Sequence, residues 1–87
     1  MGIFDLVKRE LFYNDVRDDL GDCILCVADY LACDKHPDTF KIPNGNSKHY
    51  DNMVKCLDVA IKQSQRPKES EGFKILRDRY EALSLSN

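Results

Sequence analysis

The stretch of sequence that decides the fold is residues 15–34, DVRDDLGDCILCVADYLACD. At 100° per residue, most of its apolar side chains gather into a stripe about 100° wide, which is typical of a helix packed against a core. Leu25, Ala28 and Ala32 fall on the opposite side, so only a narrow polar stripe remains. We therefore expect this helix at the centre of the fold, with neighbours on both flanks. The apolar stripe consists of Val16, Leu20, Cys23, Val27, Tyr30 and Leu31.

Apolar residues recur with helical spacing on both sides of this segment. The pattern predicts an all-α fold, a small bundle of about four helices that forms one domain over residues 1–87. The first and last helices are expected to pack about the second. Gly21 lies in the middle of that second helix, where it can mark a close helix crossing or a bend. The predicted helices span about 3–13, 15–34, 47–64 and 67–84.

Residues 35–46 do not fit a helical pattern. Pro37 and Pro43 cannot continue a regular helix, and Asn44-Gly45 strongly favours a turn. The sequence therefore predicts an irregular proline-containing loop at 35–46, and Asn46 or Ser47 is expected to cap the helix that follows.

The composition excludes several functional classes. With 87 residues and a formal net charge of −2, the chain gives no general case for binding nucleic acid. The longest uncharged apolar run, residues 23–28, is far shorter than the ~20 residues that a membrane span needs. No basic-then-apolar leader pattern opens the sequence. We expect a soluble cytoplasmic protein that has no membrane or nucleic-acid partner.

Three cysteines and a histidine, Cys23, Cys26, Cys33 and His36, have the spacing C-x2-C-x6-C-x2-H. Zinc needs four ligands that converge tetrahedrally, yet Cys33 lies about 15 Å along the helix from Cys23. A redox-active Cys23–Cys26 pair would need a strand before it, and none is predicted. We expect no metal and no cofactor. All four cysteines, Cys56 included, are expected to be core residues that react slowly with thiol reagents.

Acidic residues line one face of the predicted helix at 15–34. They follow one another at i, i+3, i+4, i+7 and i+14, within an arc of about 100°. Such a face can dock a basic patch on another protein, because charge complementarity steers encounter and selects partners. It can also be a solvated face whose carboxylates pair with Lys or Arg of the last helix. The five residues are Asp15, Asp18, Asp19, Asp22 and Asp29.

The tripeptide His36-Pro37-Asp38, placed after a helix, resembles the one that defines the J domain of DnaK-type co-chaperones. The resemblance covers residues 3–64 and implies that the helices on either side of the tripeptide pack as an antiparallel pair. It also implies that the tripeptide stimulates a chaperone ATPase. The family's helix before the tripeptide is rich in Lys and Arg, whereas the present one carries Asp22, Asp29 and Asp34. The matching apolar positions are Ile24, Val27, Leu31 and Ala32 before the tripeptide, and Tyr50, Met53, Cys56 and Leu57 after it.

The same tripeptide, in an acidic helical chain of this size, is also similar to the immunity proteins of nuclease colicins. Asp51, Val54 and Lys55 open the following helix roughly as in that family. The tyrosine-rich segment of those proteins is replaced here by residues 39–43, TFKIP. We assign the chain to neither family.

The chain contains no glycine-rich phosphate loop and no nucleophile elbow, and neither histidine has a convincing catalytic companion. We therefore expect a binding protein and not an enzyme. The expected function is that of a small adaptor or inhibitor, of a kind typical of bacteria or phages, that presents the acidic helix face and the 35–46 loop to a basic surface of a partner protein. The alternatives are a divergent J-domain-like co-chaperone and a helical bundle that binds a small ligand between subunits. The expected partner-binding residues are Asp15, Asp18, Asp19, Asp22, Asp29, His36, Asp38 and Phe40.

Overall fold

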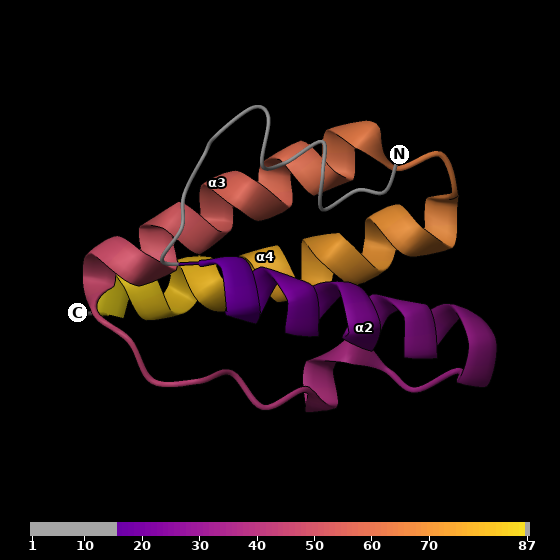
Figure 1. Ribbon diagram of the computed structural model, residues 1–87, viewed down its shortest axis with the longest axis horizontal. Helices are drawn as coiled ribbons and strands as arrows, with labels where there is room; N and C mark the ends of the chain where they lie inside the picture. Colours follow the sequence, from indigo (N-terminus) through magenta and orange to yellow (C-terminus); the bar gives the residue numbers. More distant parts are fainter. Residues whose placement is uncertain (1–15, 87) are drawn as a thin grey trace.

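The computed structural model describes residues 16–86, and within them the chain is all-α, as predicted (Figure 1). No strand occurs in this range. The sequence predicted about four helices and the described range contains three; the helix expected at about 3–13 lies outside it. No helix among residues 16–86 is both long enough and apolar enough to cross a membrane. The elements are α2 (Arg17–Cys33), the short 3-10 helix η1 (Pro37–Thr39), α3 (Ser47–Gln63) and α4 (Pro67–Ser86).

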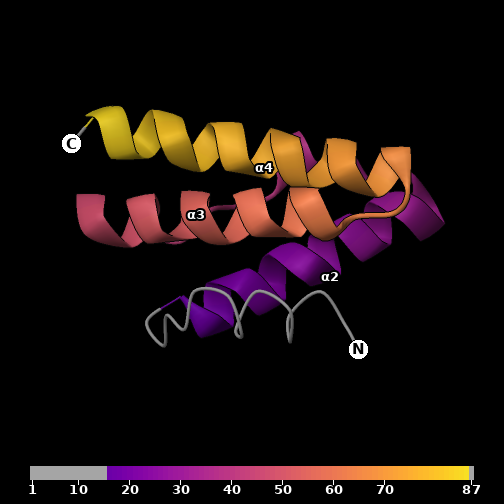
Figure 2. The ribbon, with the colours of Figure 1, turned by 90° about the horizontal axis from the view of Figure 1, so that it is seen from above.

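The helices α3 and α4 run antiparallel, side by side, and make the most extensive contact in the fold (Figure 2). The helix α2 crosses this pair obliquely and packs mainly against α4, which also contacts η1. The core forms where the three helices meet. Its buried members include Leu20, Cys23 and Val27 of α2, Met53, Leu57 and Ala60 of α3, and Phe73, Leu76 and Tyr80 of α4.

Within the described range, α2 and α4 each contact all the other elements, and α4 makes the more extensive contacts. The packing predicted on both flanks of α2 depends on the helix expected at about 3–13, which lies outside the described residues. The outer side of α2 has no neighbour in the described range. Leu25 is 65% exposed, and Ala28 and Ala32 are exposed as well. These three apolar residues suggested a second packing partner for α2, but among the described residues nothing covers them.

Local capping explains where α3 begins and where α2 ends. The Asn46 side chain accepts a hydrogen bond of 2.8 Å from the backbone N–H of His49, which confirms Asn46 as the cap of α3. Asp34 follows α2 in the left-handed conformation with φ of 56°, a conformation that Asp tolerates better than most residues. Its carboxylate accepts a hydrogen bond from Lys68 of α4, which lowers the pKa of Asp34.

A glycine does mark a close helix crossing, but it is Gly72 of α4 and not Gly21. A Cβ atom at Gly72 would lie 3.2 Å from side-chain atoms of both Tyr30 and Val27 on α2. A Cβ atom at Gly21 would meet nothing within 4 Å. The absence of a side chain at Gly72 therefore lets α2 and α4 approach each other.

We expect Gly21→Ala to raise the free energy of unfolding by about 0.5–1 kcal/mol, because alanine is the better helix former and the space is open. Gly72→Ala is the matched control and should show no such gain, since Tyr30 and Val27 would have to move. Urea unfolding followed by circular dichroism measures both values. An equal gain from the two substitutions would contradict the assignment of the crossing to Gly72.

Candidate functional site

A shallow groove lies between α2 and the loop that follows it, and we call it the α2 groove. Its volume is about 310 Å³. Half-buried Cys26 and Phe40 are its most enclosed members, whereas Asp22, Leu25 and Asp29 of α2 are exposed along it. The groove thus brings the acidic face of α2 together with residues of the predicted loop. Its full lining is Asp22, Leu25, Cys26, Asp29, Lys35, His36, Thr39 and Phe40.

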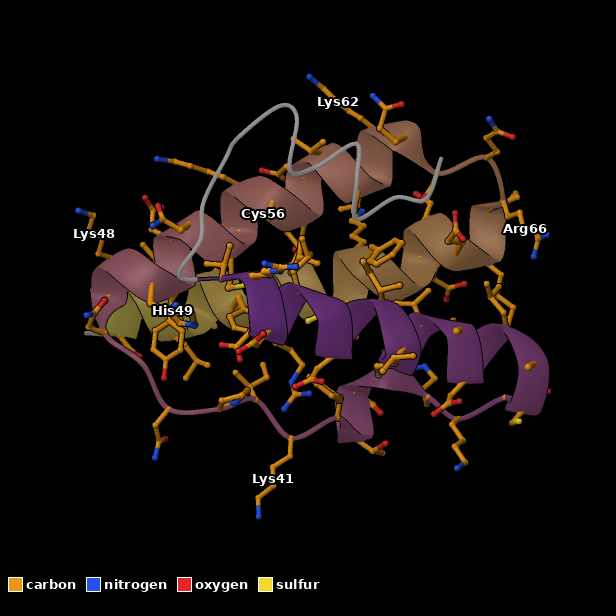
Figure 3. The ribbon with its side chains drawn as sticks, in the orientation of Figure 1. Lys41, Lys48, His49, Cys56, Lys62 and Arg66 are labelled. Atoms are coloured by element: carbon orange, nitrogen blue, oxygen red, sulfur yellow. The ribbon has the colours of Figure 1, made fainter. Side chains whose placement is uncertain are left out.

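The loop wall of the α2 groove is held in place from behind by α4. Nη1 of Arg79 donates hydrogen bonds to the backbone carbonyls of Pro37, at 3.4 Å, and of Phe40. The hydroxyl of Thr39 donates to the carbonyl of His36 at 2.8 Å, and the ring of Pro37 is buried. These contacts fix the backbone of residues 36–40, so the wall has a defined shape before any partner binds. The side chain of Lys41 points away from the molecule (Figure 3).

Two histidine–aspartate pairs occur among residues 16–86, and one of them adjoins the groove. Nδ1 of His36 lies 2.8 Å from a carboxylate oxygen of Asp38, and both side chains are more than half exposed. The ring of His36 also packs edge-on against Tyr30, with ring centroids 5.6 Å apart. His36 lines the groove, but Asp38 is not part of its lining.

The helix pairing implied by the J-domain resemblance is not found. The antiparallel neighbour of α3 is α4, and α2 makes only minor contact with α3. Tyr50 of α3 accordingly faces Tyr80 of α4, with ring centroids 6.1 Å apart. In this fold the tripeptide opens η1, where Pro37 is the first residue and contributes to the buried interior. It therefore has a clear structural role as the turn after α2.

Of the five carboxylates predicted to form a docking face, three lie as expected. Asp18, Asp22 and Asp29 are exposed on α2, and none of them forms a salt bridge with another residue of the described range. Asp15 lies outside the described residues. The carboxylates that are exposed and unpaired in this range are the ones available to attract a positively charged partner.

The carboxylate of Asp19 does not join them, because it turns toward α3. Its Oδ2 atom lies 2.6 Å from Nε2 of His49, and the two side chains are only 18% and 15% exposed. Figure 3 shows His49 at the start of α3, where the Asn46 cap sets the first turn. We therefore remove Asp19 from the predicted docking face. Asp19 thus links α2 to α3, whereas the alternative drawn from the sequence was a pair with Lys or Arg of the last helix.

The prediction that all four cysteines lie in the core is wrong for two of them. Cys23 and Cys56 are buried, but Cys26 is half-buried and Cys33 is exposed near the end of α2. Burial raises the pKa of the Cys23 thiol to about 12, and burial together with the nearby Asp29 carboxylate raises that of Cys26. No disulfide forms among the four. Within residues 16–86, no three His, Cys, Asp or Glu side chains are placed to hold a metal ion.

Thiol labelling should therefore distinguish the cysteines. At about pH 8, a thiol reagent should modify Cys33 first and Cys26 more slowly, because the thiolate is the reactive form and the pKa of Cys26 is raised. Cys23 and Cys56 should react only on unfolding. Cys33→Ser should abolish the fast phase and leave the others unchanged. Fast modification of Cys23 in the native protein would contradict the structure.

The predicted partner-binding residues do not include Leu25, Cys26, Lys35 and Thr39 of the groove, nor Arg79 behind it. The sequence does hold a signal for Leu25, since an apolar residue with Asp at i−3 and at i+4 is surrounded by charge on its own helix face. No pattern indicates Arg79, because its partners are backbone carbonyls about 40 residues earlier in the chain.

No model of a known protein family, no curated protein and no solved structure matches this chain. Its function is therefore inferred from the geometry and chemistry of its own residues.

Proposed function

We propose that the protein is a small protein-binding module, an adaptor or inhibitor, whose α2 groove docks a basic surface of a partner protein. The proposal rests on the exposure of Leu25. This large apolar side chain is 65% exposed and lies between the exposed carboxylates of Asp22 and Asp29. An apolar centre with a charged rim is the usual anatomy of a protein interface. Leu25 contributes little to the core, so its exposed surface is available for such a contact.

The charges around the groove support the choice of a basic partner. Asp18, Asp22 and Asp29 are not neutralised by salt bridges to described residues, and Lys35 is the single Lys or Arg side chain in the lining of the groove. A positive surface would gain from approaching these carboxylates, because complementary potentials raise the association rate and disfavour acidic competitors. We propose further that the protein binds its partner without catalysing a reaction and that it folds as the four-helix bundle expected from the sequence. We also propose a cytoplasmic location, where the free thiols would stay reduced.

The two alternative functions receive less support. A J-like co-chaperone needs a basic helix before the tripeptide and an antiparallel partner after it, and α2 offers neither. A small ligand held between subunits would need an enclosed site with converging polar groups, whereas the α2 groove is shallow.

The protein carries its own matched control for testing the groove. Leu25 and Leu85 are both strongly exposed, at 65% and 80%, but Leu85 lies near the end of α4 and does not line the groove. Wild type, Leu25→Ser and Leu85→Ser would be immobilised and exposed to a lysate of the source cells. We expect a partner that wild type and Leu85→Ser capture, and that Leu25→Ser loses. Retention of every captured protein by Leu25→Ser would contradict the proposed function.

A further inference from the structure

The exposed side of α2 carries a heptad seam, which is the spacing by which one helix packs along another. Five residues follow one another at intervals of four, three, four and three, which is the spacing of a and d positions in a coiled coil, but only Leu25 and Ala32 among them are apolar. All five are exposed, so the seam is not used inside the described part of the fold. They are Asp18, Asp22, Leu25, Asp29 and Ala32.

Small residues beside this seam would let another backbone come close. Gly21 and Ala28 lie seven residues apart on the same flank, and a Cβ atom at Gly21 would meet nothing within 4 Å. Packed helices lie about 8–10 Å apart, and the shorter distances require small side chains at the contact. Leu25 then stands as the one large apolar residue on the seam, next to Cys26 and Phe40 of the groove.

Building on the proposed function, we propose that the partner docks with a single basic amphipathic helix laid along the α2 seam. Asp22 and Asp29 are separated by seven residues, or about 10 Å along the axis, so Lys or Arg at the same spacing on the partner would face both. An apolar side chain between these cations would contact Leu25 and enter the groove. The seam disfavours pairing of α2 with its own copy. A parallel pair would place carboxylates opposite carboxylates, and an antiparallel pair would place them against Leu25 or Ala32 without a cation.

A second copy could in principle offer another helix, since Lys48, Lys55 and Lys62 of α3 are also seven residues apart and exposed. Figure 3 shows Lys48 and Lys62 directed away from the molecule. However, Lys55 already pairs with Asp51 at 3.4 Å, and the exposed positions of α3 hold no large apolar residue to meet Leu25. A different protein therefore fits the seam better than α3 of a second copy does.

The test uses two synthetic peptides of about three heptads, made only of Lys, Leu and Ala. One places Lys at each a position with Leu at the central d position, and the other has the same composition with the lysines spread around the helix. We expect the first to bind about tenfold more tightly at low salt and to gain helicity on binding, by isothermal titration and circular dichroism. Asp22→Asn/Asp29→Asn should abolish this preference, whereas Asp51→Asn/Asp58→Asn, on α3, should preserve it.

Equal affinity for the two peptides, or no binding of either, would overturn the proposal that the partner docks with a basic helix. It would leave the proposed function standing, because capture with Leu25→Ser does not depend on the shape of the partner. Light scattering of the protein alone should show a monomer. A dimer that dissociates on replacing Lys48, Lys55 and Lys62 by Gln would overturn the proposal in favour of a second copy.

Discussion

Replacing Leu76 by Ala is expected to lower the free energy of unfolding by about 2–5 kcal/mol. Leu76 is fully buried on α4, the helix that packs against α2, α3 and η1, so the neighbouring residues are held from several sides and cannot collapse into the space. Small domains are stable by only about 5–15 kcal/mol, and a loss of this size would lower Tm by roughly 10 °C or more. Urea unfolding and a thermal scan measure both quantities.

The control for this substitution is the same change at an exposed position. Leu25→Ala removes the same atoms from a side chain that is 65% exposed, and we expect it to alter stability by less than about 0.5 kcal/mol. A comparable loss at both positions would show that Leu25 is packed in solution, and would remove the main support for the α2 groove as a binding site.

The second large effect is expected on association. Replacing Asp18, Asp22 and Asp29 together by Asn should slow binding of a basic partner by about tenfold at low salt, because exposed charges determine long-range steering. The difference should nearly vanish at about 1 M salt, where the Debye length is about 3 Å. The fold should persist, since none of the three forms a salt bridge to a described residue. Stopped-flow measurements with the captured partner, or with the lysine seam peptide, give the rate constants.

A variant with the same change in net charge, at carboxylates that pair with Lys55 or Arg77, separates local steering from overall charge. Asp51, Asp58 and Asp78 are exposed on α3 and α4 outside the groove, and replacing them by Asn changes the net charge by the same amount. We expect at most a small decrease in association rate from this set. If both sets slow association equally, net charge is responsible and the face of α2 has no special role.

The positions of the helices along the chain could be predicted from the sequence, but the way in which they pack together could not. The ends of α3 follow from local chemistry, because Asn46 caps its start and Pro67 opens the next helix after a short turn. How the helices pack depends on which apolar face finds a neighbour. Leu25, Ala28 and Ala32 have the periodicity of a packed face, and nothing local shows that they stay exposed.

The candidate site was predictable to a similar extent. Asp22, Asp29, His36 and Phe40 were expected to bind a partner, and the fold does place them around one groove. The departure of Asp19 from this set was not predictable, because its partner His49 lies thirty residues later and meets it only through the crossing of α2 and α3. Helical periodicity places a side chain on a face, but a pair between two helices depends on how they cross.

The attachment of the loop through Arg79 bears on how such a binding surface could diversify. The guanidinium of Arg79 donates hydrogen bonds to the main-chain carbonyls of residues 37 and 40, and every amino acid has such a carbonyl. Lys35 and Lys41 have exposed side chains that take no part in these contacts, so substitutions there would change the surface that a partner touches without altering the backbone that presents it. The loop is thus suited to a randomised library, in which new recognition properties are selected while Arg79 is kept constant.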